Sequence, residues 1–334
     1  MPIIEVTNLN KHFRTFSRRE GISGSLRDLF HRQYKTLKAV DNISFQVEEG
    51  ELLGYIGPNG AGKSTSIKML TGILKPSSGQ IKVLDCDPFI DRRRYTAQIG
   101  VVFGQRTQLW WDIAVIESLR LLARIYRLRE DDFQRRLGFL NETLELKELL
   151  HTPVRKLSLG QRMRCDLAAA LIYSPKILFL DEPTIGLDAV GKDSVRSFLR
   201  RINQELKTTI IITTHDLKEI EELCQRIMII DKGHVVYDGS LERIKRISGL
   251  GKNITLDFLA EPQALAFFET FAPKLELKRE GERRVIAEYD PKQQSTVDLI
   301  RDITGRFELA DFTVSDPDIE QIIMKIYREG NSAA

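Results

Sequence analysis

A glycine-rich stretch with one lysine and one serine has the residue types that bind a chain of phosphates. It reads GPNGAGKST over residues 57–65 and satisfies the pattern G-x-x-x-x-G-K-[ST]. Glycines let the backbone curl so that several N–H groups face phosphate oxygens, and a following helix adds the positive end of its dipole. Lys63 is long enough to reach the outer phosphates, and the Ser64 hydroxyl is a ligand for Mg²⁺. The sequence therefore predicts a nucleotide site formed by Gly57, Pro58, Asn59, Gly60, Ala61, Gly62, Lys63, Ser64 and Thr65.

Two adjacent carboxylates end an apolar run farther along the chain, in ILFLDEP at residues 177–183. A strand that ends in two acids presents them at the carboxyl edge of a parallel sheet, where ligands of open α/β sheets bind. Asp181 is placed there to hold Mg²⁺ through water, and Glu182 to polarise an attacking water as a general base. His215 follows another expected strand, at 209–213, so we expect its imidazole at the same edge.

The elements that must position these residues are typical of an α/β domain. A helical pattern over 63–70 follows the phosphate loop, and further helices are expected between residues 114 and 150. Four short, almost wholly apolar runs indicate parallel strands buried on both faces: 52–56, 177–180, 209–213 and 227–230.

A composition shift at residues 248–251 marks a domain boundary. Beyond it, strands and helices alternate in the order of a small ferredoxin-like α+β domain. We therefore predict a first domain over residues 1–247 and a second domain over 252–334.

The order of the motifs resembles the nucleotide-binding subunit of ATP-binding cassette (ABC) transporters. Between the phosphate loop and ILFLDEP lies LSLGQRMR at 157–164, and GLD at 186–188 and TTHD at 213–216 follow. The LSLGQ segment separates this family from other phosphate-loop ATPases, although its usual form is LSGGQ and Leu159 replaces a glycine here. The resemblance covers residues from about 3 to 240. It implies a RecA-like sheet with an antiparallel β subdomain and a helical subdomain, and it implies ATP hydrolysis with ATP and Mg²⁺ as cofactors.

The resemblance also implies roles for residues of the subunit's own ATP site. Gln105, in VVFGQ, matches the glutamine that contacts Mg²⁺ and the attacking water. His215 matches the switch histidine that contacts the γ-phosphate. Phe13 stands where the family places its adenine-stacking aromatic residue, and packing in the core is the alternative for this side chain.

Other matched residues act across a dimer in this family. Ser158, Gly160 and Gln161 match the signature that binds the γ-phosphate of ATP held by the other subunit. Asp188 matches the loop that communicates between subunits. The resemblance thus implies a head-to-tail dimer, with a homodimer as the default and a heterodimer with a similar cassette as the alternative.

Charge is concentrated in one segment of the chain. The chain has 50 Lys and Arg against 47 Asp and Glu, a net charge of +3, which excludes a uniformly basic nucleic-acid-binding surface. Residues 11–38 contain eight basic and two acidic residues, a local charge of +6. Within an insertion at about 14–37, apolar residues at helical spacing predict a basic amphipathic helix. This helix either docks on a membrane or a partner, or packs on its own domain. The apolar residues of its predicted face are Ile22, Leu26, Leu29, Phe30, Tyr34 and Leu37.

Further resemblances point to a membrane exporter. The closing segment SDPDIEQIIMKIYREG resembles the tail of ABC-2 type exporter cassettes, and the second domain is expected to serve dimerisation or regulation, with a solvated appendage as the alternative. Trp110 and Trp111 lie where membrane subunits dock on these cassettes, and burial of both among helices is the alternative. We expect the ATPase of a drug, ion or polysaccharide exporter, peripheral on the cytoplasmic face of the membrane, with integral permease subunits and no nucleic acid as partners.

Two other classes of cassette ATPase fit the sequence less well than an exporter. A soluble cassette ATPase acting on ribosomes carries two phosphate loops, whereas this chain has one. A DNA-repair cassette carries a long coiled coil before the signature, for which the segment between Gln105 and Ser158 is too short. An importer ATPase remains the second alternative.

Overall fold

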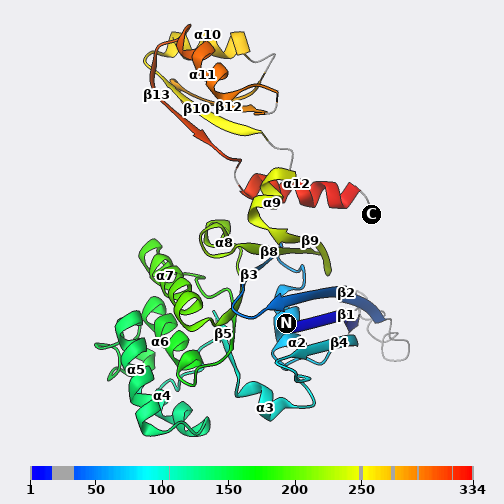
Figure 1. The fold of residues 1–334 in the computed structure, drawn as a ribbon, viewed down its shortest axis with the longest axis vertical. Coiled ribbons are helices and arrows are strands. Elements are labelled where there is room, and N and C mark those ends of the chain that lie inside the picture. Colours follow the sequence, from blue (N-terminus) through cyan, green and yellow to red (C-terminus); the bar gives the residue numbers. More distant parts are fainter. Residues whose placement is uncertain are drawn as a thin grey trace, which may run out of the picture. The chain divides into compact units, whose positions relative to one another are not determined.

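The computed structural model describes residues 2–16, 34–104, 106–247, 251–271, 275–291, 293–317 and 319–332. The chain divides into two compact units, Met1–Gly239 and Ser240–Ala334 (Figure 1). Residues 240–247, which we expected in the first domain, belong to the second unit. The reason is that α9 (Leu241–Ile247) contacts α12 (Ile319–Ser332) of the same unit.

A six-stranded sheet lies at the centre of the first unit, in the order β5-β6-β7-β3-β8-β9. Its strands β5, β6, β7, β3 and β8 pair in parallel, and β3 and β7 are buried along their whole length. Continuous apolar runs suit strands that are covered on both faces, so the predicted parallel strands are confirmed. The bounds are β3 Leu52–Ile56, β5 Ile99–Phe103, β6 Ile177–Asp181, β7 Thr209–Thr213, β8 Arg226–Asp231 and β9 His234–Ser240.

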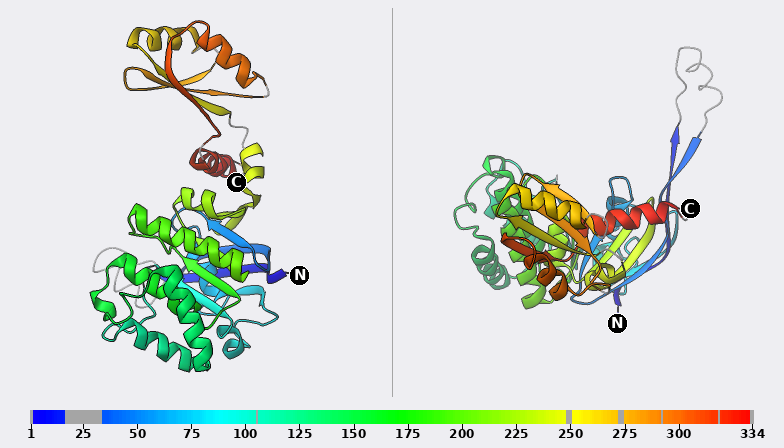
Figure 2. Two further views of the ribbon diagram at one scale, coloured as in Figure 1. Left: turned by 60° about the vertical axis from the view of Figure 1, so that its left-hand side comes forward. Right: turned by 90° about the horizontal axis from the view of Figure 1, so that it is seen from above.

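An antiparallel sheet with the order β2-β1-β4 forms a second layer of this unit: β1 Pro2–Phe16, β2 Tyr34–Glu48 and β4 Ser78–Val83. Ile4 of β1 and Phe179 of β6 belong to one hydrophobic cluster, so the two sheets share a core. The view from above in Figure 2 shows β1 and β2 projecting together as a long ribbon.

The amphipathic helix predicted over the insertion is wrong at its carboxyl end. Tyr34 and Leu37 lie in β2, where they pair with Phe16 and Phe13 of β1. Their backbone groups bond across the antiparallel ladder, and this pairing overrides a spacing that also fits a helix. The predicted helix positions Ile22, Leu26, Leu29 and Phe30 lie outside the described residues.

Helices cover the parallel sheet of the first unit. α6 packs against β5 and also contacts α4 and α5, so the helices expected between residues 114 and 150 are confirmed. Among the described residues, no helix combines the length and the apolar character needed to cross a bilayer. The bounds are α2 Lys63–Leu70, α3 Arg92–Thr96, α4 Val115–Ile125, α5 Glu130–Leu144, the 3₁₀ turn Val154–Lys156, α6 Leu159–Leu171, α7 Ala189–Leu206 and α8 Leu217–Leu223.

The second unit contains a four-stranded antiparallel sheet in the order β11-β12-β10-β13. This order and the βαββαβ sequence of elements describe the ferredoxin-like arrangement. Aromatic rings fill its core, with Phe258 and Phe267 5.3 Å apart between ring centres. The bounds are β10 Lys252–Phe258, α10 Glu261–Phe271, β11 Glu276–Glu280, β12 Arg284–Tyr289, α11 Thr296–Thr304 and β13 Leu309–Ser315.

Candidate nucleotide-hydrolysis site

The phosphate loop joins β3 to α2, as its motif requires. Gly62 is the N-cap of α2 and has φ 109°, a conformation that side chains rarely adopt. A Cβ atom at Gly62 would also lie 2.3 Å from the Ala39 carbonyl oxygen, so only glycine fits there. The loop therefore curls tightly into the start of α2, where free backbone N–H groups and the helix dipole favour a phosphate.

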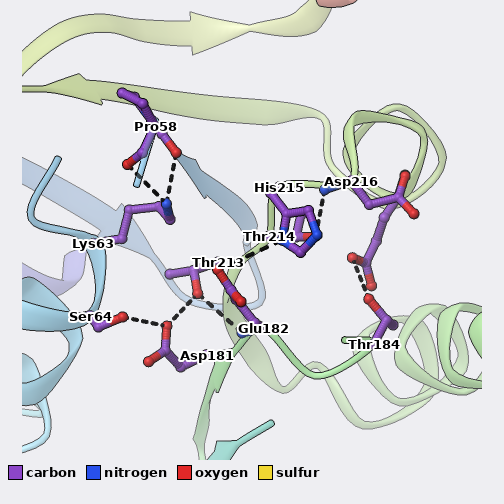
Figure 3. Close-up of polar contacts among 12 residues, drawn as sticks. Pro58, Lys63, Ser64, Asp181, Glu182, Thr184, Thr213, Thr214, His215 and Asp216 are labelled. Carbon is purple, nitrogen blue, oxygen red and sulfur yellow. Dashed lines mark hydrogen bonds and ion pairs between the residues drawn. The ribbon is translucent and has the colours of Figure 1, made fainter. Parts of the chain in front are cut away.

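Lys63 is buried inside this loop. Its ammonium donates to the Gly57 carbonyl at 2.7 Å and to the Pro58 carbonyl at 3.2 Å (Figure 3). Burial lowers the pKa of Lys63, while the carboxylates of Glu182 and Asp181 act to raise it. Because its present acceptors are neutral carbonyls, stronger charge-assisted bonds to phosphate oxygens would replace them favourably.

Asp181 ends β6 beside the phosphate loop. The Ser64 hydroxyl donates to its carboxylate at 3.2 Å, and the Thr213 hydroxyl donates at 2.6 Å (Figure 3). Thr213 stands opposite Asp181 in the parallel register, which explains this second bond. No role was predicted for Thr213, although its position at the end of an adjacent apolar strand was a signal.

The oxygens of Ser64 and Asp181 fit Mg²⁺. This ion is typically held by one or two carboxylates together with substrate phosphates and water. Among the described residues, no group of three or more His, Cys, Asp and Glu side chains is placed to hold a metal ion. Gln105, the third predicted ligand, lies outside the described residues.

Glu182 and His215 face each other at the same sheet edge. The Glu182 Oε1 lies 3.7 Å from His215 Nδ1, and the imidazole side chain is 61% exposed (Figure 3). Glu182 has φ 54° and its N–H donates to the Thr213 carbonyl at 2.9 Å, so the backbone holds it just beyond the end of β6. This arrangement presents a carboxylate as a base and an accessible imidazole beside it.

A cavity of about 340 Å³ opens in front of these groups. It is lined by the hydroxyl of Ser64 and by both carboxylates of the Asp181–Glu182 pair, with Arg106 adding positive charge. Such a volume is in the range of small-molecule sites. The structure thus brings Ser64, Asp181 and Glu182 to one cavity, with Lys63 and His215 beside them.

The signature residues lie at the start of α6 and do not line this cavity. Ser158 is the N-cap: its Oγ accepts from the Gln161 N–H at 3.3 Å, and the Gln161 side chain accepts from the Ser158 N–H at 2.9 Å. This capping box leaves the hydroxyl hydrogen of Ser158 available to a phosphate.

The departure at Leu159 has a structural counterpart in the GLD loop. A Cβ atom added at Gly186 would lie 2.8 Å from Leu159 Cδ2, so the leucine side chain occupies the space above this glycine. Asp188, two residues later, caps α7 by accepting from the Gly191 N–H at 2.7 Å. The signature and the predicted communication loop are therefore packed together within one chain.

Two polar links that were not predicted tie the catalytic strand ends to α7 and α8. Lys192 donates to the carboxylate of Asp216 at 2.6 Å, and Thr184 donates to the buried Glu219 at 3.0 Å. Burial would raise the pKa of Asp216, but the bond and charge of Lys192 bring that pKa below its usual range. Burial raises the pKa of Glu219. These links hold the segments that carry Glu182 and His215.

Three aromatic side chains are candidates for contacts with a ligand or a partner. Phe13 is half-buried in β1, and the Lys11 ammonium lies 5.2 Å from its ring centre. Trp110 and Trp111 are 41% and 49% exposed, so burial of both among helices, the alternative for this pair, is wrong. The Arg162 guanidinium of α6 lies 5.7 Å from the Trp111 ring.

A buried carboxylate joins the signature helix to the segment after Gln105. Asp166 of α6 is only 4% exposed and accepts from the Thr107 hydroxyl at 2.8 Å and from the Gln108 N–H at 3.0 Å. Burial raises the pKa of Asp166 to about 6, and these hydrogen bonds offset only part of the effect. Two parts of the predicted ATP machinery are thus connected by one ionisable group.

We predict that this carboxylate makes stability depend on pH. Because the folded state binds the Asp166 proton more tightly than the unfolded chain, its contribution to the free energy of unfolding falls as the pH rises through about 6. Between pH 5 and 7.5 the loss is about 1 kcal/mol. The side chain of Asp166→Asn does not ionise, so the variant does not share this loss. The melting temperature of the variant minus that of the parent should therefore increase from pH 5 to pH 7.5. Thermal unfolding at both pH values tests this. The exposed control Asp131→Asn should show a constant difference, and a constant difference for Asp166→Asn would contradict the prediction.

Comparisons with known proteins agree with this site. Residues 40–185 match the family model described as ABC transporter. Over 88% of this chain, the daunorubicin resistance ATP-binding protein DrrA3 of Streptomyces coeruleorubidus is 30% identical, with 93% of its own length covered. The methionine import ATP-binding protein MetN of Latilactobacillus sakei is 31% identical over 88% of this chain and 86% of its own length.

A solved structure extends the likeness to three dimensions. It is the dimeric, post-hydrolysis state of the ATP-binding cassette MJ0796 bound to ADP and phosphate. It superposes with a TM-score of 0.59 at 25% identity and covers 71% of this chain and 98% of its own. The shared fold therefore includes a cassette that hydrolyses ATP and forms a dimer.

Proposed function

We propose that this chain, which belongs to the ABC transporter family as an ATP-binding and ATP-hydrolysing subunit, powers export through membrane permease subunits. The observation that carries the catalytic part is the convergence of Ser64, Asp181, Glu182 and His215 at one sheet edge beside Lys63. Each of these groups has a chemical task in phosphoryl transfer to water.

Binding of ATP is assigned to the phosphate loop. Residues 57–65 would place N–H groups around the β- and γ-phosphates, with the Lys63 ammonium exchanging its two carbonyl partners for phosphate oxygens. Ser64 and Asp181 would hold Mg²⁺, which supplies positive charge against the phosphates when it is bound. Phe13 is the proposed contact for the adenine ring, with its other face toward Lys11.

Hydrolysis is assigned to Glu182 and His215, with Gln105 as a further contact to the water. Glu182 would accept a proton from the attacking water. The water oxygen would then bond to the γ-phosphorus while the bond between that phosphorus and the oxygen of the leaving ADP breaks. His215 would orient the γ-phosphate, since its imidazole is exposed beside the carboxylate. The products are ADP and phosphate.

Completion of the site is assigned to a second cassette. Ser158, Gly160 and Gln161 lie away from the cavity of their own chain, which suits a role toward ATP held by a partner subunit. The helix start and the free Ser158 hydroxyl hydrogen suit a phosphate. Asp188, packed beside the signature through the GLD loop, would transmit closure between subunits.

The membrane partners and the direction of transport follow from likeness. We assign the exposed Trp110 and Trp111 to a permease contact, because large aromatic side chains are frequent anchors at interfaces. The chain would then be peripheral on the cytoplasmic face. DrrA3 is named for drug resistance and MetN for import. The exporter-like closing segment favours export, with the first unit, residues 1–239, as the ATPase domain and the second unit, residues 240–334, as a dimerisation or regulatory domain.

Transport into membrane vesicles tests this direction. Inverted vesicles that contain the chain together with its membrane permease subunits should accumulate daunorubicin or sodium ions when ATP is added outside. The same vesicles with Glu182→Gln should show no ATP-dependent accumulation. Accumulation of neither cargo in inverted vesicles, or ATP-dependent uptake of methionine only by right-side-out vesicles loaded with ATP, would contradict export of drugs or ions.

A further inference from the structure

A second cavity of the first unit, of about 390 Å³, lies at the edge of the parallel sheet opposite to the edge that carries the ATP site. Lys176 and Thr208 in its lining directly precede β6 and β7, and Glu49 lies shortly before β3. Since parallel strands begin at one edge and end at the other, this cavity is at the amino edge. It is thus separate from the groups at the carboxyl edge.

The walls of this amino-edge cavity are largely apolar. Phe139 and Leu140 come from α5, Leu171 comes from the end of α6, and Leu206 comes from the end of α7. Leu140 and Leu171 are buried in the domain, whereas Leu206 is 51% exposed. Exposed leucine beside an apolar hollow leaves surface that a ligand's apolar body could cover.

The rim of the cavity is strongly basic. Its lining contains one carboxylate, that of Glu49, and four cationic side chains, which are Arg135, Arg136, Lys176 and Lys207. Within the part of the chain that the structure describes, no carboxylate lies at ion-pair distance from Lys176 or Lys207. The rim therefore has two ammonium groups that are not neutralised by an ion pair.

The two arginines are positioned by neighbouring groups. Arg136 donates to the Ile172 carbonyl at 3.1 Å, so its guanidinium is held against the end of α6. Arg135 forms an ion pair with Asp132 of the same helix. Arg135 is therefore neutralised by its carboxylate partner, whereas Lys176, Lys207 and Arg136 supply the positive charge available to a ligand.

The loops at this edge are already tied together. The Asn203 side chain donates to the Gly50 carbonyl at 2.8 Å and to the Thr208 carbonyl at 3.0 Å. These bonds join the turn before β3 to the turn before β7, across the sheet edge. A preformed cavity loses less conformational entropy on binding than a site that must be ordered.

We infer that the amino-edge cavity binds an amphiphilic organic anion, with its acid head group at Lys176 and Lys207 and its apolar body against Phe139, Leu171 and Leu206. Positive charge beside an apolar hollow matches a molecule that has both properties. A simple inorganic anion would leave the apolar walls uncovered, and an uncharged apolar molecule would leave the lysines without a partner. The occupant is therefore a carboxylate or phosphate ester with a hydrocarbon body.

Calorimetric titration of the full chain with decanoate tests this inference. Saturable binding of one decanoate per chain is expected, and decylammonium, which has the same chain and the opposite charge, should not bind. The double variant Lys176→Gln/Lys207→Gln should weaken binding by about tenfold through loss of both charges. Leu206→Gln should also weaken binding, because it removes apolar surface that is exposed in the free protein.

Matched controls separate the cavity from general surface charge. Lys147→Gln removes an exposed lysine of the same unit outside the cavity, and it should leave decanoate affinity unchanged. The ATPase rate of each variant reports that the fold is intact, since none of these residues belongs to the ATP site. Absence of decanoate binding, equal binding of decylammonium, or an unchanged affinity in the double lysine variant would overturn the inference.

Discussion

Replacement of Glu182 by glutamine should reduce ATP hydrolysis by about 10²–10⁴-fold while ATP binding is retained. The amide keeps the size of the side chain but cannot accept the proton of the attacking water. Because ATP then persists between two chains, the variant should accumulate as a nucleotide-bound dimer. Phosphate release gives the rate, and size-exclusion chromatography with light scattering gives the mass in the presence of ATP and Mg²⁺.

A second carboxylate provides the control for this variant. Glu148 is exposed and lies outside the cavity, so Glu148→Gln should hydrolyse ATP at the parental rate. If Glu182→Gln also hydrolysed ATP at that rate, Glu182 would not be the base. Loss of hydrolysis together with loss of ATP binding would instead assign Glu182 to nucleotide binding.

Replacement of Lys63 by alanine should weaken ATP binding by about 100-fold or more. The ammonium is buried where the phosphates are expected, and two charge-assisted bonds to phosphate oxygens are lost with it. In the free protein the variant loses only bonds to the Gly57 and Pro58 carbonyls, which water can replace. Titration calorimetry with ATP and Mg²⁺ gives the affinity, and thermal unfolding reports whether the fold is intact.

Two comparisons make this second result specific for phosphate. Lys75→Ala removes an exposed lysine of the same unit and should bind ATP as the parent does. Adenosine has no phosphates, so the ratio of its affinities for parent and Lys63→Ala should stay near one. An unchanged affinity for ATP in Lys63→Ala would contradict the assignment of residues 57–65 to phosphate binding.

Local pattern was sufficient for much of the architecture. The strand 52–56 and the helix 63–70 have the predicted bounds, because a continuous apolar run and a glycine-rich turn each act over a few residues. The order of strands and helices in the second unit also followed from periodicity. The pattern failed at Tyr34 and Leu37, where apolar spacing fits a helix but pairing with a distant strand decides the conformation.

Pattern and spacing identified five candidates: Lys63, Ser64, Asp181, Glu182 and His215. Each lies at or just after the end of an expected strand, and parallel strands all end at the same edge of a sheet. The bond between Asp181 and Thr213, the link between Thr184 and Glu219 and the contact of Leu159 with Gly186 could not be found in this way. They join side chains that are far apart or unremarked in the sequence, and their distances depend on how strands and helices pack.

The sequence by itself determined that this protein has a phosphate loop, paired carboxylates after a buried strand, and the motifs of an ABC cassette. These features are local, since a few consecutive residues specify each of them. Only the tertiary structure decided that Asp166 connects the signature helix to the loop after Gln105, and that Lys176 and Lys207 flank an apolar cavity. Burial and the sum of neighbouring charges belong to the packed molecule, because they arise from segments that folding alone brings together.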